Sequence, residues 1–471
     1  MVPAMSGDRN DLTIPAELGA EMTPAVRAFV EQLLRRIAAL EVQVGQTPQN
    51  SSLPPSTQHP HAKPPSGLPK SSKPSGGQPG HRKHERTLIP AEQCDRIIPY
   101  KPATCRGCGA KLKGRDLEPL RHQVWEIPLP KPVVVEHQRH RWTCVCGCTT
   151  CGTLPEDVPA HTSGPRLVAT TAILMGLFRQ SKRRTALALE TLFGVPCSPG
   201  LVVKQQQRAT AALRPCYDEL TAALPQAPAV CCDETPFKQG TSKAWLWVAI
   251  AARFSVFTIR LSRAATVPIS LLGEAFAGAI STDRYAAYNT FNGRRQICWA
   301  HLKRDIQSLI DAGGDGAQIG ERLMASLRDM FHHWHRYRDG TIQRQTMRNN
   351  IRKHCQWTVW ETLEDGQRSP HAPTATLCGD LFQRFDQLWM FLDHPGLEPT
   401  NNRAERSLRH AVIWRKLSHG TQSESGSRFV ETLLSIIETC RQQQRNAINF
   451  IAAAIEAHAR LRPAPKLLNG V

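Results

Sequence analysis

The segment AVCCDETPF, residues 229–237, joins a short apolar run of strand type to an acidic residue, Asp233. The segment AISTDRYAAY, residues 279–288, repeats this pattern, because Asp283 closes its apolar run. Runs of this kind, rich in β-branched and small apolar residues and followed by turn signals, predict buried strands. We therefore expect both aspartates to reach one edge of a single sheet.

A third carboxylate follows in TNNRAERSLR, residues 400–409, where Glu405 opens an amphipathic run of helix type. Mg2+ takes hard oxygen ligands, so acidic side chains and phosphate oxygens can complete its shell together. Two such ions about 4 Å apart can serve the attacking and leaving oxygens of an in-line displacement. Asp233, Asp283 and Glu405 are therefore candidate ligands of two Mg2+ ions. Glu234 competes with its neighbour for the first position, because adjacent strand residues point to opposite faces.

Four motifs, in this order, resemble the IS66 family of bacterial insertion-sequence transposases: DET at 233–235, TDRYAAY at 282–288, CWAHLKRD at 298–305 and NNRAERSLR at 401–409. The leader is also similar, with PQNSSLPPST at 48–57, GGQPGHRKHERTL at 76–88 and a cysteine pair ahead of the core. The resemblance covers nearly the whole chain. It implies that the catalytic DDE triad of the family falls on Asp233, Asp283 and Glu405.

Each carboxylate also has a purely structural interpretation. Asp233 could begin a turn before Pro236, Asp283 could cap a short helix, and Glu405 with Asn402 matches a capping box. The ordered set within family-like motifs favours the catalytic interpretation. His301, in CWAHLKRD, is either an active-site residue that contacts a phosphate or bound water, or a structural histidine.

The function implied is a DNA transposase that cleaves phosphodiester bonds at the ends of its element and joins them to target DNA. Water would attack first, and then the freed 3′-hydroxyl. A non-catalytic DNA-binding protein derived from a transposase is the alternative. Guanidinium groups match phosphate oxygens, so DNA contacts are expected from residues around and after the glutamate: Arg403, Arg406, Arg409, Arg415 and Lys416.

The charge distribution supports a polyanionic partner. The formal net charge is +19 and the isoelectric point is near 9.6, and cationic side chains that neutralise phosphates strengthen DNA binding. No acidic residue occurs between Glu41 and Glu85, in a tract rich in Pro, Ser and Gly. Such a tract predicts a flexible basic arm that follows DNA without reading its sequence. Its cations are Lys63, Lys70, Lys73, Arg82 and Lys83.

Ahead of the arm, apolar residues recur at steps of four and three, as in a heptad seam: Val26, Val30, Leu33, Ile37, Leu40 and Val44. Thr23 and Pro24 supply a helix start. The pattern predicts a short coiled coil that makes a homo-oligomer, and a helix that packs on its own chain is the alternative.

Two groups of cysteines predict a structural zinc site, since tetrahedral zinc commonly uses two thiolate pairs. Cys105 and Cys108 form a CxxCG knuckle. Spacing favours Cys148 and Cys151 as the later pair, whereas the family resemblance favours Cys144 and Cys146. A disulfide framework is the alternative for 15 cysteines, but a reducing cytoplasm disfavours it.

The fold class expected is multidomain α/β, with a five-stranded ribonuclease-H-like catalytic core interrupted by a helical insertion. The expected strands are 229–232, 245–251, 254–261, 279–282 and 296–298. The gap between Asp283 and Glu405 is too long for a loop, and its periodicity is helical. After the glutamate's helix, residues 428–440 are expected to form an amphipathic helix, whose apolar spacing indicates core packing and nothing more.

The expected division is a coiled-coil helix (1–47), a basic linker (48–90), a zinc-knuckle domain (91–160), a helical region (161–226), the first part of the core (227–311), the helical insertion (312–397) and the second part of the core with C-terminal helices (398–471). The helical region is either a helix-turn-helix for DNA or a plain bundle. No apolar run approaches the roughly 20 residues of a membrane span, and no secretory signal is apparent. We expect a cytoplasmic, nucleoid-associated bacterial protein; accessory proteins of the same element are compatible with the family resemblance.

Overall fold

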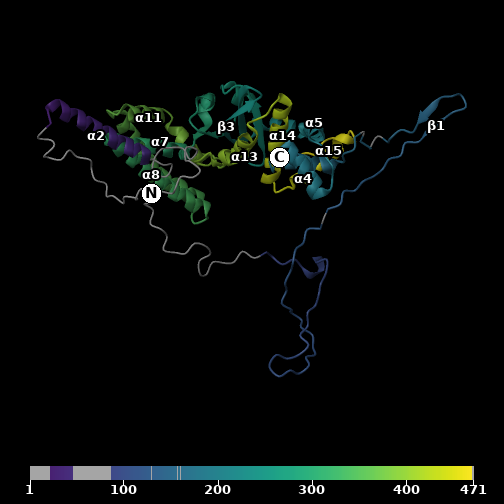
Figure 1. Ribbon diagram of the computed structural model, residues 1–471. Coiled ribbons are helices and arrows are strands. Elements are labelled where there is room, and N and C mark those ends of the chain that lie inside the picture. Colours follow the sequence, from purple (N-terminus) through teal and green to yellow (C-terminus); the bar gives the residue numbers. More distant parts are fainter. Residues whose placement is uncertain (1–21, 46–85, 129, 156–157, 160, 469–471) are drawn as a thin grey trace. The chain divides into compact units, whose positions relative to one another are not determined.

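The computed structural model describes residues 22–45, 86–128, 130–155, 158–159 and 161–468 (Figure 1). The chain divides into two compact units, residues 60–132 and the remainder, and each is described by itself. The five cations of the predicted basic arm lie outside the described residues: Lys63, Lys70, Lys73, Arg82 and Lys83.

A five-stranded sheet lies at the centre of the larger unit. Its strands are β3 (Ala229–Gln239), β4 (Ser242–Ile250), β5 (Ser255–Arg260), β6 (Ala279–Thr282) and β7 (Arg295–Ile297). Their spatial order is β5-β4-β3-β6-β7; β3 and β5 run antiparallel to β4, whereas β6 joins β3 in parallel and β7 joins β6 in parallel. α6 (Thr266–Leu272) connects β5 to β6. Each expected strand has an observed counterpart.

Strand β3 is longer than the sequence predicts. It was expected to end at Cys232, but it continues through Asp233 and Pro236 to Gln239. β4 pairs with it along the whole extension, while pairing with β6 stops at Cys231. A proline has no N–H to donate, and it is tolerated in a strand that has a partner on one side only.

The expected helical region, 161–226, contains α3 (Pro165–Gly176), α4 (Lys182–Phe193) and α5 (Pro199–Ala223). Ser181 and Ser198 accept backbone N–H groups as N-caps, and Gly194 ends α4 with a positive φ of 63°. α3 and α5 belong to the same hydrophobic core as the sheet, which supports the bundle interpretation. The basic start of α4 is exposed.

Three helices complete this core: α13 (Asn402–Ser418), α14 (Glu424–Gln442) and α15 (Ala447–Ala459). α14 packs into the core as expected, and it also makes polar contacts with the sheet. Its Ser435 and Thr439 side chains accept the N–H groups of Phe257 and Ser255 at 2.8 and 3.1 Å, and Glu431 accepts that of Ile259. Because strand N–H groups point outward at every second residue, this polar row covers the free edge of β5.

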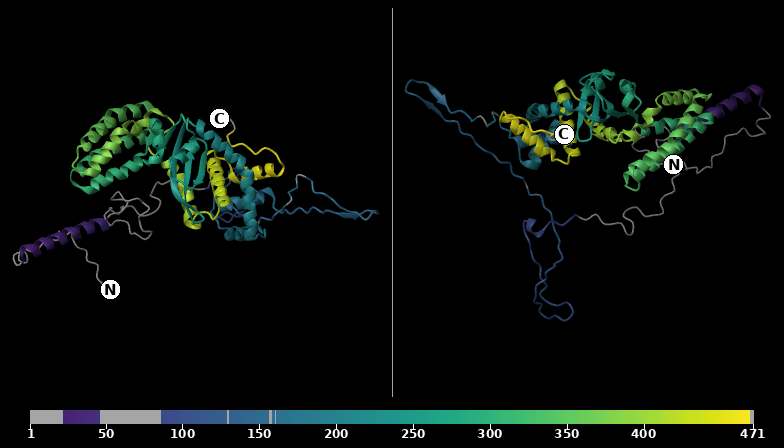
Figure 2. Two further views of the ribbon diagram at one scale, coloured as in Figure 1. Left: turned by 90° about the horizontal axis from the view of Figure 1, so that it is seen from above. Right: turned by 180° about the vertical axis from the view of Figure 1, so that it is seen from behind.

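Between β7 and α13 the chain is helical, and a second hydrophobic core lies here. α7 (Trp299–Ala312) leads into α8 (Gly314–Arg338), α9 (Arg344–Ile351), a π-helical turn η5 (Arg352–Gln356), α10 (Trp357–Gln367), α11 (Ala372–Gln383) and α12 (Phe385–Asp393). In Figure 2 these helices, in green, lie to one side of the sheet, with the yellow C-terminal helices on the other. We call the helices α8 to α12 the insertion.

The expected N-terminal helix is present as α2 (Pro24–Gly45). Val26, Leu33 and Ile37 of the predicted seam are each more than two fifths exposed, and the side chains of Leu40 and Val44 lie outside the described residues. The coiled coil therefore stays a prediction. Among the described helices, none is both long and apolar enough to cross a membrane.

Both cysteine groups lie in tight turns. In residues 60–132, Cys105 accepts the N–H of Gly109 at its carbonyl, and Gly109 has a φ of 73°. In the larger unit, the hairpin of β1 (Arg141–Thr143) and β2 (Thr149–Cys151) turns at Gly147, with a φ of 82°. Zinc binding and the choice of the later pair stay predictions.

Candidate active site

Asp233 lies on β3, and Asp283 directly follows the last residue of the neighbouring parallel strand β6. Cys231 of β3 lies opposite Ser281 of β6, and each aspartate stands two residues further on. Because side chains at an even offset return to the same face, and parallel strands run in one direction, both carboxylates reach the same edge of the sheet.

The carboxyl of Asp233 lies among other acidic groups. Burial raises its pKa well above the usual value, and the charges of Glu234, Asp283 and Glu405 raise it further, while an N–H donated by Glu234 at 2.9 Å lowers it. Repulsion between carboxylates of this kind acts over a short range. Asp283 and Glu405 are thus close enough to Asp233 to disfavour its ionisation.

Asp283 begins a tight turn at the end of β6. Its Oδ1 accepts the N–H of Tyr285 at 2.9 Å, and its carbonyl oxygen accepts the Thr282 hydroxyl at 2.7 Å and the Arg295 guanidinium at 2.5 Å. Aspartate commonly shapes turns through such a side-chain bond to the backbone two residues on. The local sequence therefore fixes the carboxylate relative to its own turn.

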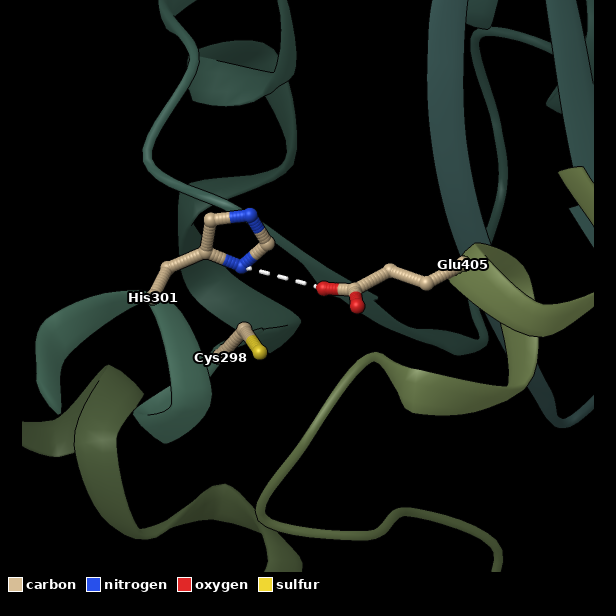
Figure 3. A group of neighbouring side chains, drawn as sticks. All are labelled: Cys298, His301 and Glu405. Atoms are coloured by element: carbon tan, nitrogen blue, oxygen red, sulfur yellow. Dashed lines mark ion pairs between the residues drawn. The ribbon is translucent and has the colours of Figure 1, made fainter. Parts of the chain in front are cut away.

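Glu405 lies in the first turn of α13 and faces two residues at the start of α7 (Figure 3). His301 Nδ1 is 3.5 Å from Glu405 Oε1, and the ligand atoms of Cys298, His301 and Glu405 all lie within 4.8 Å of one another. Burial raises the pKa of the Cys298 thiol to about 11, although N–H groups of Asn401 and His301 lower it. The thiol is thus protonated at neutral pH, and His301 is the group beside Glu405 that is able to bind a phosphate or water.

Asn401 holds the start of α13 against the sheet. It is fully buried, its Nδ2 donates to the carbonyl of Cys232 at 2.7 Å, and its backbone N–H donates to Cys298 Sγ at 3.1 Å. The capping-box alternative named Asn402, but Asn401 is the N-cap residue and makes no side-chain capping bond. The position of Glu405 relative to Asp233 therefore depends on Asn401.

Glu234 is engaged elsewhere. Its carboxylate accepts Arg263 Nη2 at 2.7 Å and the Tyr288 hydroxyl at 2.7 Å, and the Arg263 guanidinium lies 3.8 Å from the ring centre of Tyr285. Burial raises the pKa of Glu234, while the bonds from Tyr288 and Arg263 lower it. A carboxylate with two strong donors is a poorer candidate for the metal than Asp233.

The five cations expected near DNA divide into two groups. Arg403 Nη2 donates to the carbonyl of Ala251 at 3.1 Å, and Arg415 Nη1 donates to the carbonyl of Pro236 at 2.7 Å. Both therefore attach α13 to the sheet. Arg406, Arg409 and Lys416 are exposed on α13, where phosphates can reach them.

Sequence reasoning missed Asn401, Arg295 and the two donors to Glu234, Arg263 and Tyr288. Asn401 stands in the NNRAERSLR motif without an assigned role, and Arg295 lies outside the motifs. Tyr288 belongs to the TDRYAAY motif, and this motif was a signal in the sequence that Tyr288 lies near the acidic residues of β3. Arg263 follows a strand with no motif around it, and its partner is 29 positions away.

More than half of the chain is similar to a known protein family. Residues 162–428, which carry all three carboxylates, match a family model described as "Transposase IS66 family". Residues 6–87 match a family of unknown function (DUF6444). An uncharacterized protein, y4qI, of Sinorhizobium fredii is 24% identical over 416 residues, which cover 80% of this chain and 74% of the relative. A second, y4hP, from the same organism is 24% identical over 387 residues, covering 74% and 69%.

Proposed function

The chain belongs to the transposase IS66 family, and from this premise we propose that it cleaves DNA at the ends of its element and joins those ends to target DNA, with Asp233, Asp283 and Glu405 as the catalytic triad. The observation that supports the triad most is geometric: Asp233 and Asp283 reach the same edge of the sheet, and Glu405 lies in the first turn of the helix that Asn401 attaches to β3. Carboxylates that repel one another in a buried setting favour the binding of a cation.

The donor set fits Mg2+, because all three groups offer hard oxygens. Asp233, Asp283 and Glu405 would hold two ions, which when bound supply activation of the attacking oxygen and stabilisation of the leaving one. His301 would orient a phosphate or an attacking water beside Glu405. Nδ1 of His301 is buried and lies 3.5 Å from Glu405 Oε1, so the imidazole stands directly beside that carboxylate.

We also propose a ribonuclease-H-like identity for the core. Two features support this identity. The sheet has three antiparallel strands followed by two parallel ones, and the two aspartates lie where β3 meets β6. The helices α8 to α12 would be the insertion of the core between Asp283 and Glu405.

DNA is the proposed partner. The net charge of +19 supports this, as do the exposed cations Arg406, Arg409 and Lys416 on α13. The basic arm would follow the DNA backbone without sequence preference. We propose a cytoplasmic, nucleoid-associated location, self-association through α2, and cooperation with accessory proteins of the same element.

A structural zinc ion is proposed for the cysteine turns. Backbone and side-chain donors of Cys108 and the N–H of Gly107 lower the pKa of Cys105, and donors of Cys146 similarly lower that of Cys144. A lowered thiol pKa favours the thiolate, which is the form that binds zinc. Either Cys144 with Cys146 or Cys148 with Cys151 would complete the site. Zinc content of paired serine variants at 144/146 and at 148/151 tests the choice.

The test of the triad uses Asp233→Asn, Asp283→Asn and Glu405→Gln, with Glu234→Gln as the control carboxylate. Mg2+-dependent cleavage of element ends and binding of the same DNA are measured side by side. We expect each triad variant to lose cleavage and to keep DNA binding, which comes mainly from lysines and arginines. Glu234→Gln should keep cleavage. Cleavage by a triad variant removes that residue from the triad, and absence of cleavage in the wild type favours the non-catalytic alternative.

A further inference from the structure

The turn that carries Asp283 is held on its sheet side by a buried cation. Arg295, at the start of β7, has no exposed surface and donates to Thr282 Oγ1 at 2.8 Å and to the carbonyl oxygens of Asp283 and Tyr285 at 2.5 and 3.2 Å. Burial lowers its pKa to about 10, so the group is charged at neutral pH. Burying a charge among neutral acceptors is costly, and here the guanidinium fixes three groups of one short turn.

The other side of the same turn is held by the insertion. Arg284, the residue after Asp283, donates from Nη1 to Asp380 Oδ2 and from Nη2 to Asp305 Oδ2, both at 3.0 Å. Asp380 lies on α11 and Asp305 on α7. The Arg284 and Asp380 side chains are 28% and 30% exposed, so solvent screens this pair only in part.

The two sides are joined by a short chain of contacts. Arg384, directly after α11, pairs with Asp380 at 2.9 Å and donates to Asn289 Oδ1 at 3.4 Å. Arg295 donates to that same oxygen at 2.8 Å. The insertion therefore contacts the Asp283 turn directly through Arg284, and indirectly through Asn289 and Arg295.

We propose that the insertion is a positioning element of the metal site, in which Asp380 acts through Arg284 to hold Asp283 in its ligand position. This inference rests on the proposed function, since it takes Asp283 as a metal ligand. Ligand side chains have to be held to within about half an ångström of the productive geometry. Groups that orient a ligand typically contribute about 10-fold to 100-fold in metal affinity or activity.

The experiment compares Asp380→Asn with Asp365→Asn in the full chain. Asp365 is the matched control, because it makes an equivalent bond to Arg322 at 2.8 Å between α10 and α8 of the same insertion. Mn2+ is titrated into each protein without DNA, and the Mg2+ dependence of cleavage and the thermal midpoint are measured. Asp380→Asn should weaken Mn2+ binding and raise the Mg2+ concentration for half-maximal cleavage by roughly 10-fold, whereas Asp365→Asn should match the wild type.

Asp283→Asn and Asp380→Glu complete the series. Asp283→Asn should abolish the Mn2+ binding in question, and Asp380→Glu, which keeps the charge, should restore part of it. Equal Mn2+ affinity in the Asp380→Asn and Asp365→Asn proteins overturns the inference, as does a lowered thermal midpoint of Asp380→Asn with unchanged Mn2+ affinity. Wild-type Mn2+ binding and cleavage by Asp283→Asn would instead overturn the triad itself, which is a separate result.

Discussion

Asn401 supplies no catalytic chemistry, yet it connects three segments that are far apart in the chain. Its side chain bonds to the backbone of β3 beside Asp233, its N–H bonds to the thiol that precedes α7, and its own carbonyl accepts the N–H of Glu405 at 3.2 Å. A single buried amide thus relates the first and third carboxylates. An aspartate of the same size could not donate to the Cys232 carbonyl.

Replacing Asn401 with alanine should destabilise the protein by about 1–3 kcal/mol, because the buried carbonyl of Cys232 would lose its donor. Urea unfolding measures the free energy, and cleavage rates report the displacement of Glu405. Asn402→Ala is the control, since Asn402 is exposed on the next position. An equal free energy of unfolding for both variants would contradict the role given to Asn401.

Asp233 predicts a pH dependence of stability. Its folded-state pKa is raised by burial and by neighbouring carboxylates, so its contribution to stability is present below the unfolded pKa of about 3.9 and is lost as pH rises through the folded pKa. At pH 7 without divalent ions, Asp233→Asn should be more stable than the wild type. The difference should shrink as the pH falls towards 4, or when Mg2+ is added. A stability difference between Asp233→Asn and the wild type that grows as the pH falls would show that ionisation of Asp233 does not destabilise the folded protein.

At the scale of elements, α14 has two kinds of contact with the sheet. Its apolar residues enter the core, while Glu431, Ser435 and Thr439, four positions apart, meet alternate N–H groups of β5. Four helical residues rise about 6 Å, close to the span of two strand residues. The spacing of these side chains along α14 therefore matches the spacing of the outward N–H groups along β5 over three contacts.

Ser435→Ala should cost about 1–3 kcal/mol, because it leaves the buried N–H of Phe257 without its acceptor. Ser425→Ala, at an exposed position in the first turn of the same helix, should stay within about 0.5 kcal/mol of the wild type. Thermal and urea unfolding of both variants check this. A neutral Ser435→Ala would mean that water replaces the hydroxyl at this edge.

Local signals account for what could be predicted. Ser181, Ser198 and Gly194 mark helix ends by bonds within a few residues, and the strands show apolar runs, so both kinds of element have signals in the local sequence. Pro236 is a local signal for the end of a strand, and it led to the wrong end for β3. The sequence does not show that β3 has a partner on one side only at this point, where a proline is tolerated. The polar row of α14 resembles a solvent-facing stripe for the same reason. Acidic site residues were identified by motif order, whereas Asn401 and Arg295 act through bonds to backbone carbonyls, and the side-chain sequence does not show which carbonyls need a donor.

At the scale of the whole molecule, α2 carries the prediction of self-association. Its seam residues Val26, Leu33 and Ile37 are exposed in the single chain, and Asp at two of them would place charge in a buried seam. Leu33→Asp with Ile37→Asp should lower the mass measured by light scattering to that of one chain. Gln32→Asp with Arg36→Asp, just outside the seam, should leave the mass unchanged. A single-chain mass for the wild type would contradict the coiled coil.

The polar residues of α14 that cover the edge of β5 are synthesised later than β5 itself. β5 leaves the ribosome 172 to 184 residues before its partners on α14, a delay of roughly 10 to 40 seconds at ordinary translation rates. During that time the strand has an open edge, which is a template for pairing with other chains. A gene copy interrupted just before codon 424 would still encode all three carboxylates, but its product should aggregate during translation instead of accumulating as a competing inactive transposase.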